Sequence, residues 1–139
     1  MTGGSRPRLG ESLASGAFFS PTIFTDVRPD STLAREEVFG PVLAVIAFDD
    51  EGEALRLAND TDYGLNGALW TNDLTRAHRM ARGIEAGTVY VNTINGGAVA
   101  PHDRYKGSGL GIAGGREQLE AMTRLKSVLV NLGGPTPSL

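Results

Sequence analysis

The chain has 139 residues with 13 basic and 16 acidic side chains, which give a formal net charge of -3. This length allows one modest domain with its own core. A slight negative charge, with basic residues spread along the chain, argues against a nucleic-acid surface and against a polybasic membrane patch. Because the chain contains no cysteine, disulfides and thiolate metal sites are excluded. We therefore expect neither nucleic acid nor a membrane as a partner, and no metal site.

The amino-terminal residues and the apolar runs bear on location. Residues 1–7 lack the apolar stretch of a secretory signal. The longest apolar run, residues 42–48, is far too short to cross a bilayer. We therefore expect a soluble protein of the cytoplasm.

The first predicted strand covers residues 42–48, an apolar run without polar alternation that lies between a Gly-Pro pair and two aspartates. The Gly-Pro pair breaks any helix that precedes this run. Asp49 or Asp50 can cap the next helix, whose apolar positions end near Asn59. The strand and the helix form a first α/β unit.

A second unit follows with the same order of elements. Residues 68–71 form a predicted strand, and Asn72 or Asp73 caps a helix whose apolar positions keep helical spacing until Gly87. Residues 88–92 form the third strand. This alternation predicts an α/β fold with a mainly parallel sheet and crossover helices.

The pattern then changes to a Gly-rich loop over residues 95–115, long enough to indicate a functional loop. A helix over residues 116–125 and a strand over residues 127–132 are predicted to close the ordered chain. Residues 133–139 contain two prolines and two glycines and are predicted to form a flexible tail. The predicted organisation is one domain over residues 1–132 followed by this tail.

Within the Gly-rich loop, residues 109–114 satisfy a GxGxxG pattern. A dinucleotide fingerprint follows a strand in a βαβ unit and precedes an acidic residue about twenty positions later. Here a loop precedes the pattern, and no acidic residue follows residue 125. We therefore interpret the segment as a flexible loop that leads into a helix.

Six short motifs stand out along the chain in a fixed order. They are REEVFGPVLAV at residues 35–45, NDTDYGL at 59–65, WTNDL at 70–74, EAGTVYVN at 85–92, YKGSG at 105–109 and KSVLV at 126–130. In this order and at this spacing, they resemble the C-terminal part of the NAD(P)-dependent aldehyde dehydrogenase family. The resemblance runs from about Gly3 to Leu132 and implies part of that family's catalytic and oligomerisation domain.

The resemblance implies two site residues in this chain, Glu37 and Phe39. Glu37 matches the family glutamate that accepts hydrogen bonds from the nicotinamide ribose hydroxyls, and Phe39 matches the aromatic residue packed beside that ribose. An ionised carboxylate can accept from both hydroxyls of a vicinal diol, and an aromatic edge limits where the nicotinamide ring sits. Without the resemblance, the alternative interpretation is that Glu37 is a solvated surface charge and that Phe39 packs in the core as a core plug.

The resemblance further implies oxidation of an aldehyde to a carboxylic acid with NAD or NADP, through a thiohemiacetal on a cysteine. This chain has no cysteine, and the family's dinucleotide-binding domain and general-base glutamate lie upstream of the matched part. We therefore identify no catalytic residue. We expect the isolated chain to be inactive and to bind neither cofactor tightly, while an aldehyde is the substrate of a complete enzyme.

A non-catalytic, truncated product that acts as an oligomerisation or binding module is the alternative. In the resembling family, the strand that matches residues 127–132 adds to a sheet of a neighbouring subunit. An apolar strand without a partner invites association, so we expect a homo-oligomer formed through exposed strands. The two hypotheses differ because only the dehydrogenase hypothesis predicts NAD(P) affinity after complementation.

Other polar and aromatic residues have structural interpretations. His102 lies in the segment that matches the family's substrate-entrance loop, and we favour a solvated loop histidine over a substrate contact. Trp70 is predicted to lie in the core. Tyr105 and Lys106 are predicted to support the loop, because neighbouring residues on an extended chain point in opposite directions.

Overall fold

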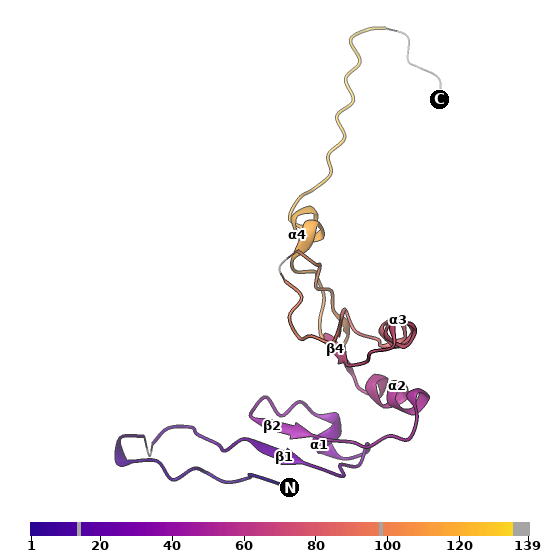
Figure 1. Cartoon of the computed structure of the whole chain (residues 1–139). Coiled ribbons are helices and arrows are strands. Elements are labelled where there is room, and N and C mark those ends of the chain that lie inside the picture. The colour runs from indigo at the N-terminus through magenta and orange to yellow at the C-terminus, as the bar shows by residue number, and fades with distance from the viewer. Residues whose placement is uncertain (14, 98, 135–139) are drawn as a thin grey trace.

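The computed structural model describes residues 1–13, 15–97 and 99–134. In the amino-terminal part, two three-residue strands pair in parallel, with Thr22 opposite Val42. This part forms the lower region of Figure 1. Its elements are the 3-10 turn η1 (Glu11–Leu13), strand β1 (Thr22–Phe24), helix α1 (Thr32–Arg35) and strand β2 (Val42–Ala44).

The middle of the chain forms a parallel β-α-β unit with one further helix before it. Helix α3 connects two strands that pair in parallel, and its buried side chains are Ala77 and Met80. The Asp73 side chain caps α3 by accepting a hydrogen bond from the Arg76 N–H at 3.0 Å. The predicted α/β fold with crossover helices is therefore confirmed. The elements are α2 (Glu51–Asn59), β4 (Asn66–Leu69), α3 (Leu74–Gly83) and β5 (Thr88–Val91).

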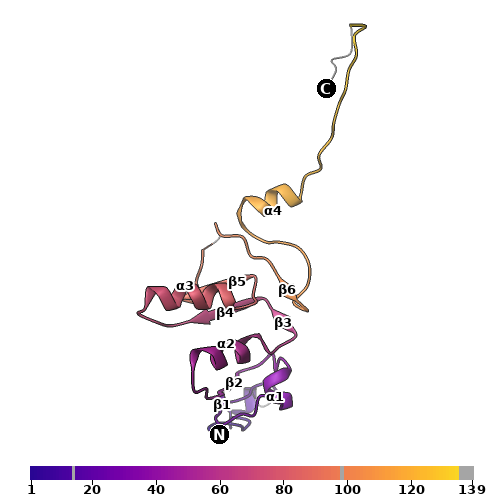
Figure 2. The ribbon, with the colours of Figure 1, turned by 90° about the vertical axis from the view of Figure 1, so that its right-hand side faces the viewer.

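A short antiparallel pair links the Gly-rich loop back to the body of the molecule. Strand β3 (Tyr63–Gly64) pairs with β6 (Tyr105–Lys106), so the segment before the last helix returns to the end of α2. Helix α4 (Gly115–Ala121) follows, and the chain beyond it extends away from the body as an arm (Figure 2).

Two predictions about the core are wrong. Strand β2 ends at Ala44, and Leu43 and Phe48 of the predicted buried strand are 57% and 59% exposed. Trp70 is 65% exposed. An apolar pattern shows which side chains favour burial, but burial also needs a second layer of protein. No described element covers the exposed sides of Leu43, Phe48 and Trp70.

Residues 127–132 are extended but form no strand in the described part of the chain. Leu129 and Leu132 are 97% and 94% exposed. The predicted terminal strand is therefore not formed here, because a strand needs a hydrogen-bonded neighbour and no described segment pairs with the arm. Of the predicted tail, residues 135–139 lie outside the described residues.

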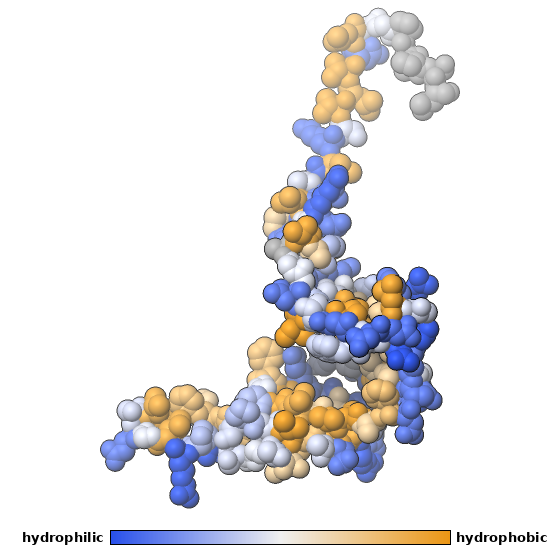
Figure 3. Space-filling view, viewed as in Figure 1, coloured by the Kyte–Doolittle hydropathy of each residue, from blue (hydrophilic) through white to orange (hydrophobic). Residues whose placement is uncertain are grey.

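The chain exposes far more surface than its mass requires. A compact monomer of this size exposes about 6,900 Å², whereas this chain exposes 11457 Å². Apolar side chains gather on the outside of the body and along the arm (Figure 3), and an open groove of about 810 Å³ lies between α2 and β4. Among the described residues, no helix is both long and apolar enough to span a membrane.

A carboxylate of α2 ties this helix to α3. Glu51 accepts hydrogen bonds from Arg79 Nε at 2.5 Å and from Arg76 Nε at 3.0 Å. The hydrogen bond from Arg79, and then that from Arg76, lowers the pKa of Glu51 from 4.5 to about 2. The ion pairs therefore persist well into the acidic range.

We expect the Glu51→Gln variant to lose stability above about pH 4.5 and to approach the unsubstituted chain below it. The pKa of Glu51 is lower in the folded state, so its contribution is complete above the unfolded pKa of 4.5 and is lost as the pH falls toward 2. Thermal unfolding followed by circular dichroism at several pH values measures this difference. Glu117→Gln in α4 is the control. A difference in unfolding temperature between Glu51→Gln and the unsubstituted chain that stays constant down to pH 2 would contradict the lowered pKa of Glu51.

Candidate functional site

The candidate site is the loop of residues 36–41, which connects α1 to β2 and carries both predicted site residues. The loop begins where α1 ends, because the Glu36 N–H donates to the Thr32 carbonyl at 2.9 Å. Its other end is fixed at Pro41, whose carbonyl accepts a hydrogen bond from the Thr22 N–H at 2.9 Å. The backbone of this loop is therefore fixed at both ends by hydrogen bonds.

The side chains of Glu37 and Phe39 are both exposed to solvent on this loop. Phe39 is 94% exposed and has a φ of 22°. Positive φ is uncommon for an aromatic residue and is a source of backbone strain. Glu37 is also exposed, and its carboxylate makes no hydrogen bond or ion pair with the described residues. The interpretation of Phe39 as a core plug is therefore wrong, and the Glu37 carboxylate is free to accept hydrogen bonds.

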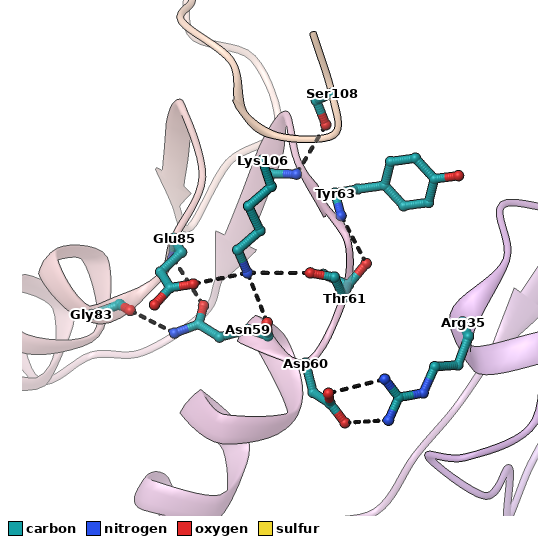
Figure 4. Close-up of polar contacts among 10 residues, drawn as sticks. Arg35, Asn59, Asp60, Thr61, Tyr63, Gly83, Glu85, Lys106 and Ser108 are labelled. Carbon is teal, nitrogen blue, oxygen red and sulfur yellow. Dashed lines mark hydrogen bonds and ion pairs between the residues drawn. The ribbon is translucent and has the colours of Figure 1, made fainter.

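Arg35, the last residue of α1, anchors the start of this loop. Its guanidinium binds the Asp60 carboxylate with two hydrogen bonds, of 3.0 Å from Nη1 and 2.6 Å from Nη2 (Figure 4). Its Nε also donates to the Pro29 carbonyl at 3.1 Å. The arrangement has the paired geometry that makes arginine–carboxylate contacts the stronger kind of ion pair.

Lys106 organises the turn that contains Asp60. Its ammonium group lies 2.7 Å from the Asn59 carbonyl, 3.3 Å from the Thr61 carbonyl and 2.8 Å from Glu85 Oε2. The positive charge at the carboxyl end of α2 is favourable for the helix dipole. These contacts give Lys106 a structural role at the turn of residues 59–61.

The side chain of Asn59 joins the ends of two helices. Its Nδ2 donates to the Gly83 carbonyl at 2.8 Å, and its Oδ1 accepts from the Glu85 N–H at 2.9 Å. Gly83 is the last residue of α3. The end of α2, the end of α3 and β6 thus meet at the turn of residues 59–61.

His102 has a more ordered environment than a solvated loop position. Its side chain is half-buried, with Nδ1 3.0 Å from Thr88 Oγ1, and its backbone pairs with Ala113. The interpretation as a solvated histidine is therefore wrong. No hydrogen bond of the described residues connects His102 with the loop of residues 36–41.

The GxGxxG segment at residues 109–114 lies between β6, which is antiparallel, and the short helix α4. The Arg104 guanidinium donates to the Leu110 carbonyl at 2.7 Å, which ties the segment to its own loop. The interpretation as a loop that leads into a helix is confirmed. The described residues also contain no group of acidic or histidine side chains placed to hold a metal ion.

Sequence reasoning missed the partnership of Arg35 with Asp60. The two residues are 25 positions apart. Asp60 follows the end of a predicted helix, which indicates a turn, and Arg35 begins a motif. The sequence shows Arg35 and Asp60 as polar residues beside the ends of predicted elements, but no local pattern connects the two.

Comparisons with known proteins give consistent matches. A sequence model described as the aldehyde dehydrogenase family matches residues 1–128. The NADP/NAD-dependent aldehyde dehydrogenase PuuC of Escherichia coli is 48% identical over 124 residues, which are 88% of this chain and 25% of that protein.

Solved structures match in shape as well as in sequence. An NAD-dependent aldehyde dehydrogenase from Sinorhizobium meliloti is 40% identical with a TM-score of 0.86, and the match covers 99% of this chain and 27% of that one. A betaine aldehyde dehydrogenase from Staphylococcus aureus in complex with NAD+ is 41% identical with a TM-score of 0.86, covering 96% of this chain and 27% of that one. The chain therefore spans about a quarter of the length of these relatives.

Proposed function

Because the chain belongs to the aldehyde dehydrogenase family, we propose that it is part of the catalytic domain of an NAD- or NADP-dependent enzyme that oxidises an aldehyde to a carboxylic acid. The observation that carries this proposal is the open loop of residues 36–41 within a segment that matches the family along most of its length. Its role in the reaction is to position the cofactor.

The residues of this loop fit the nicotinamide end of the cofactor. A ribose presents two neighbouring hydroxyl donors, and Glu37 presents an exposed carboxylate without a partner among the described residues. Phe39, almost fully exposed beside it, offers an apolar face to a ring or sugar. When bound, the cofactor supplies the acceptor for a hydride. Glu37 and Phe39 orient it and take no part in breaking bonds.

The remaining parts of the reaction must come from another segment of polypeptide. The chain has no cysteine, so it offers no thiolate to attack an aldehyde. Its exposed surface of 11457 Å² is far larger than that of a compact monomer of this mass. This excess favours burial of part of the surface against further protein, either in the same polypeptide or in another. We therefore propose that the chain acts only together with a dinucleotide-binding part and a nucleophile.

Reconstitution tests this proposal. The chain is fused behind the part of the related Escherichia coli enzyme that precedes the matched segment, and this fusion is called the reconstituted enzyme. We expect aldehyde-dependent formation of reduced nicotinamide from the reconstituted enzyme and none from the 139-residue chain or the upstream part alone. A folded fusion with no activity and no more cofactor affinity than the upstream part would contradict the proposal.

One observation favours a second function, that of a non-catalytic oligomerisation module. The arm beyond α4 exposes a run of apolar side chains, with Val128 and Val130 at 71% and 72% exposure. Such a segment can add to a sheet of another chain whether or not a cofactor binds. The inactive outcome of the reconstitution would leave this function as the better explanation.

A further inference from the structure

The amino-terminal part of the structure is joined to the rest by few polar contacts. Between residues 1–48 and residues 50–134, the described atoms form hydrogen bonds and ion pairs at one place only, between Arg35 and Asp60. The loop of residues 36–41 starts directly after Arg35. Among these polar contacts, that pair alone links the start of this loop to the turn after α2.

The Asp60 side of the pair is a firm anchor. Asp60 follows the last residue of α2, and its N–H donates to the Leu57 carbonyl at 3.3 Å. The carbonyls on either side of it, those of Asn59 and Thr61, both accept from the Lys106 ammonium group. Figure 4 shows this ammonium group and the Arg35 guanidinium held by the same turn. The turn is fixed by groups that do not depend on Arg35.

The Arg35 side transmits this position to the loop. Two hydrogen bonds to one carboxylate fix the plane of the guanidinium, and the third, to the Pro29 carbonyl, fixes its stem. Glu37 is two residues farther along the chain and, among the described residues, forms no hydrogen bond or ion pair with α2. A tilt of the end of α1 therefore moves the Glu37 carboxylate directly.

We propose that Arg35 and Asp60 are a pair of positioning residues that sets the place of Glu37 and Phe39 for the cofactor ribose. The proposal rests on the proposed function, because it assigns to the pair an effect on cofactor binding. Arg35 and Asp60 act through the loop, and this role requires no contact of either side chain with the cofactor or the aldehyde. Breaking the pair lowers the fraction of molecules whose loop is ready to bind, which weakens apparent affinity in proportion.

Asp60→Asn in the reconstituted enzyme tests the pair with almost no change of shape. We expect hydrogen exchange of the hydrogen-bonded amides at the end of α1, those of Ala34, Arg35 and Glu36, to become about threefold to tenfold faster without cofactor, in keeping with an exposed but bidentate ion pair. We expect the KM for the cofactor to rise by a similar factor, while kcat and the KM for the aldehyde stay within about twofold.

A matched control is available in the same part of the chain. Arg28 binds Asp30 with two hydrogen bonds, of 3.0 and 2.5 Å, but both residues precede α1, and among the described residues neither side chain forms a hydrogen bond or ion pair with the side chain of another element. Asp30→Asn removes the same chemistry and is expected to leave the cofactor KM unchanged. The charge exchange Arg35→Asp with Asp60→Arg rebuilds the pair and is expected to restore part of the affinity.

The outcomes separate this inference from the proposed function. Unchanged exchange in Asp60→Asn, or faster exchange with an unchanged cofactor KM, would overturn the positioning role. An equal effect of Asp30→Asn would overturn it as well. Failure of the proposed function is read on the unsubstituted reconstituted enzyme, as a lack of cofactor-dependent activity, and needs no variant.

Discussion

Replacing Glu37 by Gln in the reconstituted enzyme is expected to raise the KM for the cofactor about 10- to 100-fold. A hydrogen bond to a charged group contributes about 1.5–3 kcal/mol, and about 1.4 kcal/mol corresponds to a factor of ten. The amide keeps one accepting oxygen but loses the charge and presents a donor to a hydroxyl. Steady-state kinetics with varied cofactor at saturating aldehyde measures the change.

The neighbouring carboxylate is the control for this prediction. Glu36 is also exposed, but its backbone closes α1 through the hydrogen bond to the Thr32 carbonyl, which Glu36→Gln preserves. We expect Glu36→Gln to change the cofactor KM by less than about twofold, as for ordinary surface positions. Equal effects of the two variants would show that only the local negative charge matters, and no effect of Glu37→Gln would contradict its assignment to the ribose.

The β4-α3-β5 unit shows what local sequence can predict. The α3 helix carries apolar positions at helical spacing and is capped by Asp73, and both signals lie within a few residues of each other. The parallel pairing of the flanking strands then follows from the order of elements. The motif around Glu37 and Phe39 likewise lies in one continuous stretch of sequence, so the loop of residues 36–41 can be singled out from local sequence.

Burial and long-range contacts depend on parts that local patterns do not describe. Phe48 and Trp70 are large apolar residues of the kind usually found in a core. Both are exposed because no described element packs over them. The pair of Arg35 with Asp60 joins residues 25 positions apart, so neither periodicity nor capping rules connect them. The sequence therefore predicted the candidate site but not the contacts that hold it.

The second large effect concerns the arm beyond α4, whose exposed apolar side chains need a partner. Leu129 is 97% exposed and lies between Val128 and Val130, which are also largely exposed. Burying one such side chain contributes about 1.5–3 kcal/mol. We therefore expect the 139-residue chain to self-associate at micromolar concentration and Leu129→Asp to shift it strongly toward the monomer, because a buried unpaired carboxylate is costly.

Asn131→Asp supplies the matched control, because it adds the same charge to the same arm at a polar position. Light scattering after size-exclusion chromatography gives the mass of each variant at equal concentration. If Leu129→Asp and Asn131→Asp dissociate the assembly equally, net charge and not the apolar run governs association. A monomeric mass for the unsubstituted chain would remove the basis for an oligomerisation module. The arm would then need burial within the same polypeptide, since no described segment of this chain covers it.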